Sequence, residues 1–404
     1  MELETIQETI KKILKGSNKP RPALQTTIDY YIIEDRDPGP SKPLEPDARN
    51  PLLEAGDPAG QGGYTPIGLD TSSGIIRTPF FNIVIVTGSL STPRIPELYD
   101  HPEVYTYPVK PRIRPPYIIL GTDSEAEEEG SGITTRNPLG SPYGYNYSPE
   151  RIADEYRMWT ENWLLSDPLH KALEEEANTR ATPVVLVDGP LFQTPQLVSR
   201  ITGNPEPGGL WHTMISDRIS IIRKYEDNGI PVIGIVKRID QSRLLVSSEA
   251  YTRKTLLRCG SKLAGHEPPN DQALVYMLLS TGRCSPRGAA RTPIMEYRSH
   301  EYGASKLYTY IAIPPNPWSR LVYTYRIYRL EFTHRTLRIL GEHSLTPWSV
   351  LLGETLRHGV TEPFTVKMSD HRAGMLAQAL RQRMRRLVSA SHIPFTYDEI
   401  HSGV

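Results

Sequence analysis

Continuous apolar runs in the first 240 residues predict strands that are buried on both faces. Residues 80–88 form one such run and residues 231–236 another, while residues 183–187 form a third run that stops on Asp188. A Gly-Pro pair follows Asp188 and turns the chain. Runs of this length, rich in β-branched residues and closed by turn residues, are typical of buried strands.

A fourth strand is predicted at residues 64–70, where the sequence Ile-Gly-Leu ends on Asp70. The next four residues, Thr-Ser-Ser-Gly, have the composition of a turn. We therefore expect Asp70, like Asp188, to stand at the end of a strand. Lys237 closes the run at 231–236 in the same way.

Helical patterns alternate with these strands. Ser148, Pro149 and Glu150 supply a capping side chain, a proline at the first helical position and an acid in the first turn, so we expect a helix from there to about residues 164–166. Residues 211–228 predict a second, amphipathic helix. The alternation of strands and helices predicts the α/β class, with crossover connections.

The later sequence predicts a hairpin and four helices. Alternating apolar and polar residues at 307–314 and 318–332 indicate paired strands. The predicted helices are residues 242–261, residues 271–279, a helix beginning near 345–347, and a long basic helix at 367–389. No apolar run approaches the ~18–20 residues that span a bilayer, so we expect a cytoplasmic protein without a membrane contact.

Composition gives a three-part organisation of the 404 residues. We expect an N-terminal helix and loop-rich arm at 1–63, one domain at 64–389, and a tail at 390–404. Residues 89–149 are rich in Pro and Tyr and are interpreted as an insertion in that domain. Ile6, Ile10 and Ile13 share one face of the first helix and make it a candidate dimer interface.

Charge and cysteine content exclude some classes of function. The 46 basic and 46 acidic side chains balance, so any nucleic-acid site must be a local groove rather than a generally basic surface. Two cysteines, in no Cys-x-x-Cys or Cys/His cluster, make a zinc site improbable on pattern alone.

Three acids have positions that suit a metal site. Asp70 and Asp188 close predicted strands, and Glu161 lies on the helix between them. Carboxylates that meet at one edge of a sheet repel one another unless a cation is present, and hard cations such as Mn²⁺ or Mg²⁺ prefer oxygen ligands. Lys237 could neutralise a phosphate or orient a water molecule. Taken singly, the aspartates also fit turn caps and Glu161 fits an exposed helix acid, with Glu155 and Glu174–Glu176 as rivals.

An ordered set of short motifs resembles the archaeal NurA nuclease family. The motifs are Gly68-Leu69-Asp70-Thr71-Ser72, Arg157 to Glu161, Leu186-Val187-Asp188-Gly189-Pro190-Leu191, the strand closing in Lys237, Asp271, and the segment from Glu362 to His371. The resemblance implies an RNase H-like core with a mixed central sheet flanked by helices. It implies metal-binding roles for Asp70, Glu161 and Asp188, with Asp370 or His371 at the family's last metal position. The family's tyrosine near the end is replaced here by Glu362 or Phe364.

The resemblance also implies a function. It predicts a deoxyribonuclease that uses Mn²⁺ or Mg²⁺, with two ions, as a 5′-3′ exonuclease or single-strand endonuclease on DNA ends. It further implies a homodimer that acts in end resection and double-strand break repair with a HerA-type hexameric ATPase. Two alternatives stay open: a binding partner of a DNA translocase whose site has decayed, and a metal-dependent phosphatase or nucleotidyl-transfer enzyme.

Overall fold

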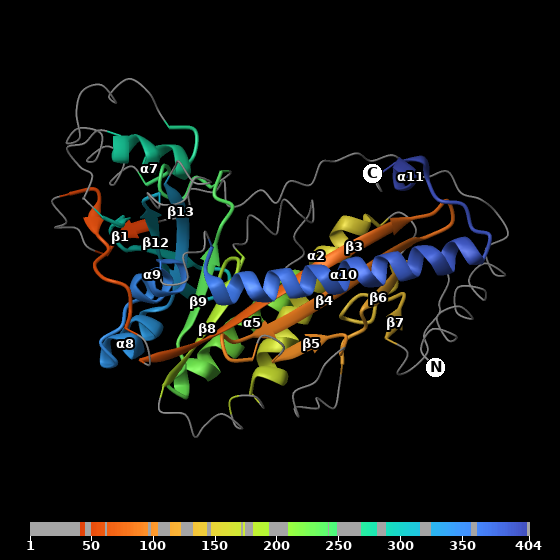
Figure 1. Ribbon diagram of the computed structural model, residues 1–404, viewed down its shortest axis with the longest axis horizontal. Coiled ribbons are helices and arrows are strands. Elements are labelled where there is room, and N and C mark those ends of the chain that lie inside the picture. Colours follow the sequence, from red (N-terminus) through yellow and green to blue (C-terminus); the bar gives the residue numbers. More distant parts are fainter. Residues whose placement is uncertain are drawn as a thin grey trace. The chain divides into compact units, whose positions relative to one another are not determined.

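A computed structural model gives the fold of the protein (Figure 1). It describes residues 41–44, 50–60, 63–95, 98–103, 114–122, 132–143, 147–170, 173, 181–193, 209–240, 242–248, 268–280, 288–315, 325–356 and 362–401. The chain divides into two compact units. The first comprises Met1–Tyr30, Leu69–Ala177 and Met368–Val404, and the second Tyr31–Gly68 and Asn178–Lys367.

The first unit is a mixed sheet between helices. Its strands include β4 (Asn82–Ser91), to which β5 (Tyr99–His101) and β6 (Ile118–Gly121) pair in antiparallel fashion, and β7 (Ile133–Thr134), which runs parallel to β6. Successive residues of β4 point to opposite faces. Val84 and Val86 pack against Ile152 and Tyr156 of α2 (Pro149–Ser166). The cluster on the other face joins Ile83 and Ile85 to Met384 and Val388 of α10 (Phe364–Ala390).

Helix α2 confirms the predicted helix start and end. Ser148 has an extended backbone, its side chain accepts a hydrogen bond from the Arg151 amide, and Pro149 is the first helical residue. The helix ends at Ser166, as the pattern predicts.

Strand β3 (Tyr64–Arg77) corrects one prediction. It is one 14-residue strand, so the predicted turn at residues 71–74 is wrong and Asp70 lies within the strand rather than at its end. The β-branched Thr71 favours extended backbone. Because Thr71 is buried and its hydroxyl is hydrogen-bonded to Glu161, a tertiary contact satisfies the polar group that turn chemistry would otherwise use.

The second unit is a larger mixed sheet. Its strands follow the order β1-β11-β12-β13-β9-β8, with β10 on β12 and β2 on β10. They are β1 (Ser41–Pro43), β2 (Leu53–Glu54), β8 (Thr182–Asp188), β9 (Val232–Val236), β10 (Ala290–Arg291), β11 (Met295–Ser299), β12 (Ala304–Ile313) and β13 (Arg326–Phe332). The helices are α5 (Leu210–Asp227), α7 (Asp271–Ser280), α8 (His334–Glu342) and α9 (Pro347–Leu356).

The β8–α5–β9 segment confirms the predicted crossover. β8 and β9 are parallel, and Asp188 pairs in register with Ile235. The predicted late hairpin is also confirmed, since β12 and β13 are antiparallel. Strand β8 ends on Asp188 and β9 ends one residue before Lys237, so both residues lie at the same ends of neighbouring parallel strands.

Several predicted segments lie outside the described residues. These are the first helix and most of the helix predicted at 242–261, whose described residues 242–248 contain turns rather than a helix. Within residues 89–149, the described strands β5, β6 and β7 belong to the sheet of the first unit. Of the helices that the structure describes, none combines the length and the hydropathy needed to cross a membrane.

Candidate functional site

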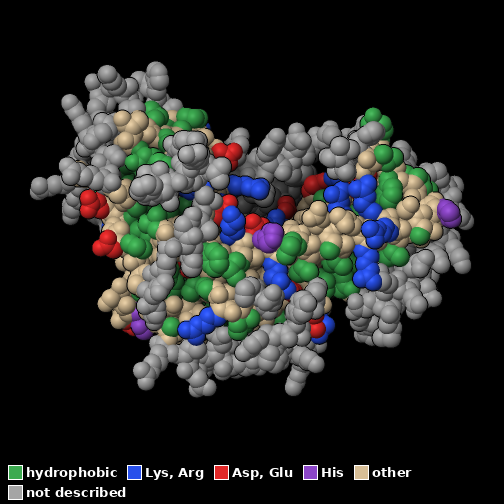
Figure 2. Space-filling view, viewed as in Figure 1, with side chains coloured by type: hydrophobic (Ala, Val, Ile, Leu, Met, Phe, Trp, Pro, Cys, Tyr) green, Lys and Arg blue, Asp and Glu red, His purple; other side chains and the backbone are tan. Residues whose placement is uncertain are grey.

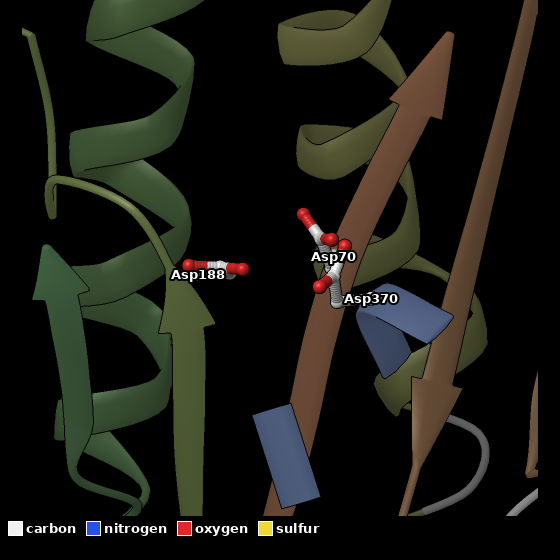
Figure 3. Close-up of side chains that lie close together, drawn as sticks. All are labelled: Asp70, Asp188 and Asp370. Atoms are coloured by element: carbon white, nitrogen blue, oxygen red, sulfur yellow. The ribbon is translucent and has the colours of Figure 1, made fainter. Parts of the chain in front are cut away.

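The first unit brings two aspartates together. Asp70, in the middle of β3, is only 4% exposed, and Asp370 lies exposed on α10. A carboxylate oxygen of Asp70 lies within 4.8 Å of one from Asp370, and Figure 3 shows both side chains. Because Asp70 is buried, a second negative charge this close to it makes the ionised pair less stable, and a cation between the two carboxylates would offset that repulsion.

Glu161 of α2 reaches the strand residue next to Asp70. The hydroxyl of Thr71 donates to Glu161 Oε1 at 2.7 Å, and Arg157 Nε donates to the same hydroxyl at 3.3 Å. The predicted Arg and Glu of this helix therefore meet the predicted strand at Thr71. Glu161 therefore contacts the residue that directly follows Asp70 in the chain.

Glu155, a rival for the helix position, is engaged elsewhere. It is buried and accepts hydrogen bonds from Tyr143 at 2.9 Å, from Tyr147, and from Arg151 at 3.3 Å. These three donors engage both of its oxygens. Glu174 lies outside the described residues.

Asp154 is an acid that the sequence pattern did not single out. Burial raises its pKa to about 6, against the opposing effect of Arg157. It precedes Arg157 by three residues and Glu161 by seven, which is a spacing that keeps the three on one face of a helix. That spacing is the signal by which it could have been found.

The second unit contributes Asp188 and Lys237. Lys237 Nζ lies 2.6 Å from Asp188 Oδ2 and 3.6 Å from Glu362 Oε2. The side chains of Asp188 and Lys237 are 13% and 22% exposed. The partly buried Asp188 carboxylate therefore has the cationic partner that its position requires. Glu362 is a second acid that pairs with the same lysine.

Two elements pass from one unit to the other, and each carries one of the paired aspartates close to the passage. In β3 the division falls between Gly68 and Leu69, two residues before Asp70. In α10 it falls between Lys367 and Met368, three residues before Asp370.

His371, the alternative to Asp370, follows it on α10 and is exposed. Asp370 lies close to Asp70, whereas His371 does not belong to that group of possible metal ligands. Asp271, which the family resemblance included, is fully buried in the second unit. Its carboxylate accepts from Ser242 at 2.6 Å and from the backbone amides of Leu245 and Val246 at 2.9 and 2.8 Å, which is a structural role.

The chain is similar to known proteins over most of its length. A family model described as the NurA domain matches residues 64–333. The crystal structure of the NurA nuclease from Sulfolobus solfataricus is 14% identical, with 86% of this chain and 89% of that chain covered and a TM-score of 0.40. A crystal structure of NurA with manganese is 10% identical, with 96% and 97% covered and a TM-score of 0.40. No curated protein matches the chain. The family model spans well over half of the 404 residues, and the protein therefore belongs to the NurA domain family.

Proposed function

We propose that this protein is a divalent-metal-dependent nuclease that cleaves DNA, and that Asp70, Asp188 and Asp370 hold its metal. The observation that carries the proposal is the pair of carboxylates from Asp70 and Asp370, whose oxygens lie close enough to bind one cation together. Asp188 ends strand β8 of the second unit, and it is proposed as the third ligand because the resemblance to the NurA family gives it a metal-binding role. Membership of the NurA domain family supports the same assignment.

The donor set selects the class of metal. Three carboxylates, with Glu161 as a fourth beyond Thr71, offer oxygen ligands only. Such a set suits Mn²⁺ or Mg²⁺ and does not suit zinc in a structural site. A pair of these ions, when bound, activates a water molecule and stabilises the leaving oxygen of a phosphodiester.

Lys237 has a role of its own in the proposal. Its ammonium lies between Asp188 and Glu362, so it can balance the charge of Asp188 and donate an N–H hydrogen bond to a phosphate oxygen. A compact, strongly hydrated charge with three donors suits that task. Lys237 is thus proposed as a substrate-binding group rather than a metal ligand.

A basic surface on α10 supports DNA as the substrate. Arg381 and Arg385 both pair with the buried Glu399, whereas Arg383 and Arg386 are exposed. Figure 2 shows Lys and Arg side chains gathered over this helix. Since the chain as a whole has no net charge, a local group of arginines is the kind of surface that a nucleic-acid phosphate would contact.

The remaining parts of the proposal rest on the family resemblance. They are the action on single- or double-stranded DNA ends as a 5′-3′ exonuclease or single-strand endonuclease, the homodimer, the HerA-type hexameric ATPase and the role in end resection. Sedimentation at micromolar concentration tests the dimer, and a monomer would count against it. Digestion of end-labelled DNA with and without the ATPase tests the partnership.

The decisive experiment removes one metal-binding oxygen at a time. D70N, D188N and D370N should each lower Mn²⁺-dependent cleavage of linear DNA by at least about 100-fold, because the charge and the ligand are both lost. Each should also lose the rise in melting temperature that Mn²⁺ gives the wild type. D227N is the matched control, because Asp227 is 57% exposed and pairs with Arg335.

Circular dichroism of each variant checks that the fold is kept. If D188N cleaved DNA and bound Mn²⁺ like the wild type, the assignment of Asp188 would be wrong. If the wild type itself showed neither Mn²⁺-dependent stabilisation nor cleavage, the decayed binding partner would be the better description.

A further inference from the structure

The turn that follows Asp188 is held by unusually close backbone contacts. Gly189 has a φ of 130°, and its amide donates to the Ile235 carbonyl at 3.0 Å. Gly234 of β9 faces the same turn, and a Cβ on Gly234 would lie 2.7 Å from the Leu191 nitrogen and 2.8 Å from the Gly189 oxygen. The turn therefore packs backbone against backbone, with no room for a side chain.

A buried ion pair forms hydrogen bonds with the backbone of Leu191 and Phe192, which follow that turn. Glu331 of β13 and Lys306 of β12 are fully buried, and Lys306 Nζ lies 2.8 Å from Glu331 Oε2. The same carboxylate oxygen accepts the Leu191 amide at 2.9 Å, and Lys306 Nζ donates to the Phe192 carbonyl at 2.9 Å. One charged pair thus satisfies a backbone donor and a backbone acceptor, three and four residues after Asp188.

The ion pair is itself part of a larger buried network. Arg329 Nε donates to Glu331 Oε1 at 2.9 Å, and a terminal nitrogen of Arg329 donates to Ser242 at 2.8 Å. Ser242 in turn donates to Asp271 at 2.6 Å, and Tyr310 also donates to that carboxylate. Two cations and two carboxylates balance, so the network is neutral inside the second unit.

Stability alone gives no reason to keep such a network. Burying an ion pair costs several kcal/mol of desolvation per ion, and well-packed apolar residues in its place are often neutral or stabilising. An apolar pair could not accept the Leu191 amide or donate to the Phe192 carbonyl. What the charged pair adds is a fixed direction for the backbone at residues 189–192.

We propose that Lys306 and Glu331 are positioning residues for the metal site, because they fix the turn at residues 189–192 and so set the direction of the Asp188 side chain. This inference rests on the proposed role of Asp188 as a metal ligand. Groups that orient a metal ligand typically change metal affinity about 10- to 100-fold when they are lost.

The test replaces both charges at once with K306M/E331M. The double substitution removes one positive and one negative charge, so the buried network stays neutral, with Arg329 and Asp271 linked through Ser242. Calorimetry with MnCl₂ should give a 10- to 100-fold weaker affinity for Mn²⁺, and kcat for DNA cleavage should fall while KM for DNA stays within about twofold. A structural role alone would lower the melting temperature and leave the Mn²⁺ affinity of the folded protein unchanged. Wild-type Mn²⁺ affinity in K306M/E331M would overturn the inference.

Two further variants keep the answer clear. T309V removes the hydrogen bond from Thr309 to the Thr292 carbonyl, 2.8 Å long, on the same strand as Lys306, and it should lose stability without losing Mn²⁺ affinity. G234A pushes on the same turn without altering a charge. It should weaken Mn²⁺ binding, and it decides the question if K306M/E331M does not fold, since wild-type affinity in G234A would then overturn the inference.

D188N separates this inference from the proposed function. If D188N binds Mn²⁺ as the wild type does, then Asp188 is not a ligand and the proposed function fails at that residue. If D188N loses Mn²⁺ while K306M/E331M and G234A retain it, the metal site stands and the positioning role alone is refuted.

Discussion

The ammonium of Lys237 lies 2.6 Å from a carboxylate oxygen of Asp188. This lysine and a divalent cation would compete for the same negative charge. Removal of the lysine should therefore change how strongly Mn²⁺ stabilises the protein.

K237M should increase the rise in melting temperature that Mn²⁺ produces, relative to the wild type. Without Lys237 the acids near Asp188 repel one another more strongly, so the metal-free protein is less stable and the metal restores more. Cleavage should nevertheless fall by about 100- to 1000-fold if Lys237 binds the phosphate. Differential scanning fluorimetry over a MnCl₂ series measures the first effect. K237R, which keeps the charge, serves as its control, and an equal or smaller Mn²⁺ shift in K237M would refute the competition.

T71V should weaken Mn²⁺ binding and cost about 1 kcal/mol of stability, the usual net value of one buried hydrogen bond. Thr71 is buried, and its hydroxyl links Glu161 to Arg157, so the valine removes one hydrogen bond that holds Glu161. T71S keeps the hydroxyl and should keep Mn²⁺ affinity. Urea unfolding together with Mn²⁺ titration measures both quantities. Equal affinities in T71V and T71S would remove Glu161 from the site.

His101 should make the protein less stable in mild acid. The residue is buried beside Trp163 and Tyr117, and neither ring nitrogen has a hydrogen-bond partner among the described residues. Burial, with a smaller effect from Arg114, lowers the pKa of His101 to about 3. The unfolded chain binds a proton near pH 6.5 and the folded chain does not, so stability is fully present above pH 6.5 and declines as the pH falls towards 3.

The size of this effect can be isolated with H101F, which keeps an aromatic ring and removes the titrating group. At pH 5 the wild type should have lost about 2 kcal/mol relative to pH 8, beyond any loss in H101F. Urea unfolding at pH 5, 6, 7 and 8 gives the comparison. Parallel pH profiles for the two proteins would show that His101 is not the group responsible.

R383Q/R386Q should weaken DNA binding and reduce its dependence on salt. Both arginines are exposed on α10, and each phosphate contact contributes about 0.9 to the slope of log affinity against log salt for duplex DNA. Loss of two contacts should therefore lower the slope by about 2. R298Q is the control, because Arg298 is 67% exposed and lies in the other unit. An unchanged slope in R383Q/R386Q would place the DNA elsewhere.

Much of the local structure could be predicted from the sequence because the signals are local. The apolar run that stops on Asp188, the capped start of α2 at Ser148 and the lysine after β9 are each contained within a few residues. The order of these elements was enough to predict the α/β class and the parallel β8–α5–β9 crossover.

The failures have one physical cause, which is contact between residues distant in sequence. The segment after Asp70 has turn composition, yet it stays extended because Thr71 finds its partner 90 residues away on α2. Glu331 meets the Leu191 amide across 140 residues. In the sequence, Lys306 and Glu331 resemble ordinary polar positions of alternating strands, and only the fold shows that both are fully buried.

The division of the first unit into three stretches of chain has a consequence for biosynthesis. Asp370 is translated after every other acid of the proposed site, on a helix that also completes the packing of the first unit. A chain truncated anywhere upstream of α10 would lack both. If Asp370 holds the metal as proposed, DNA cleavage should therefore require that synthesis has passed α10.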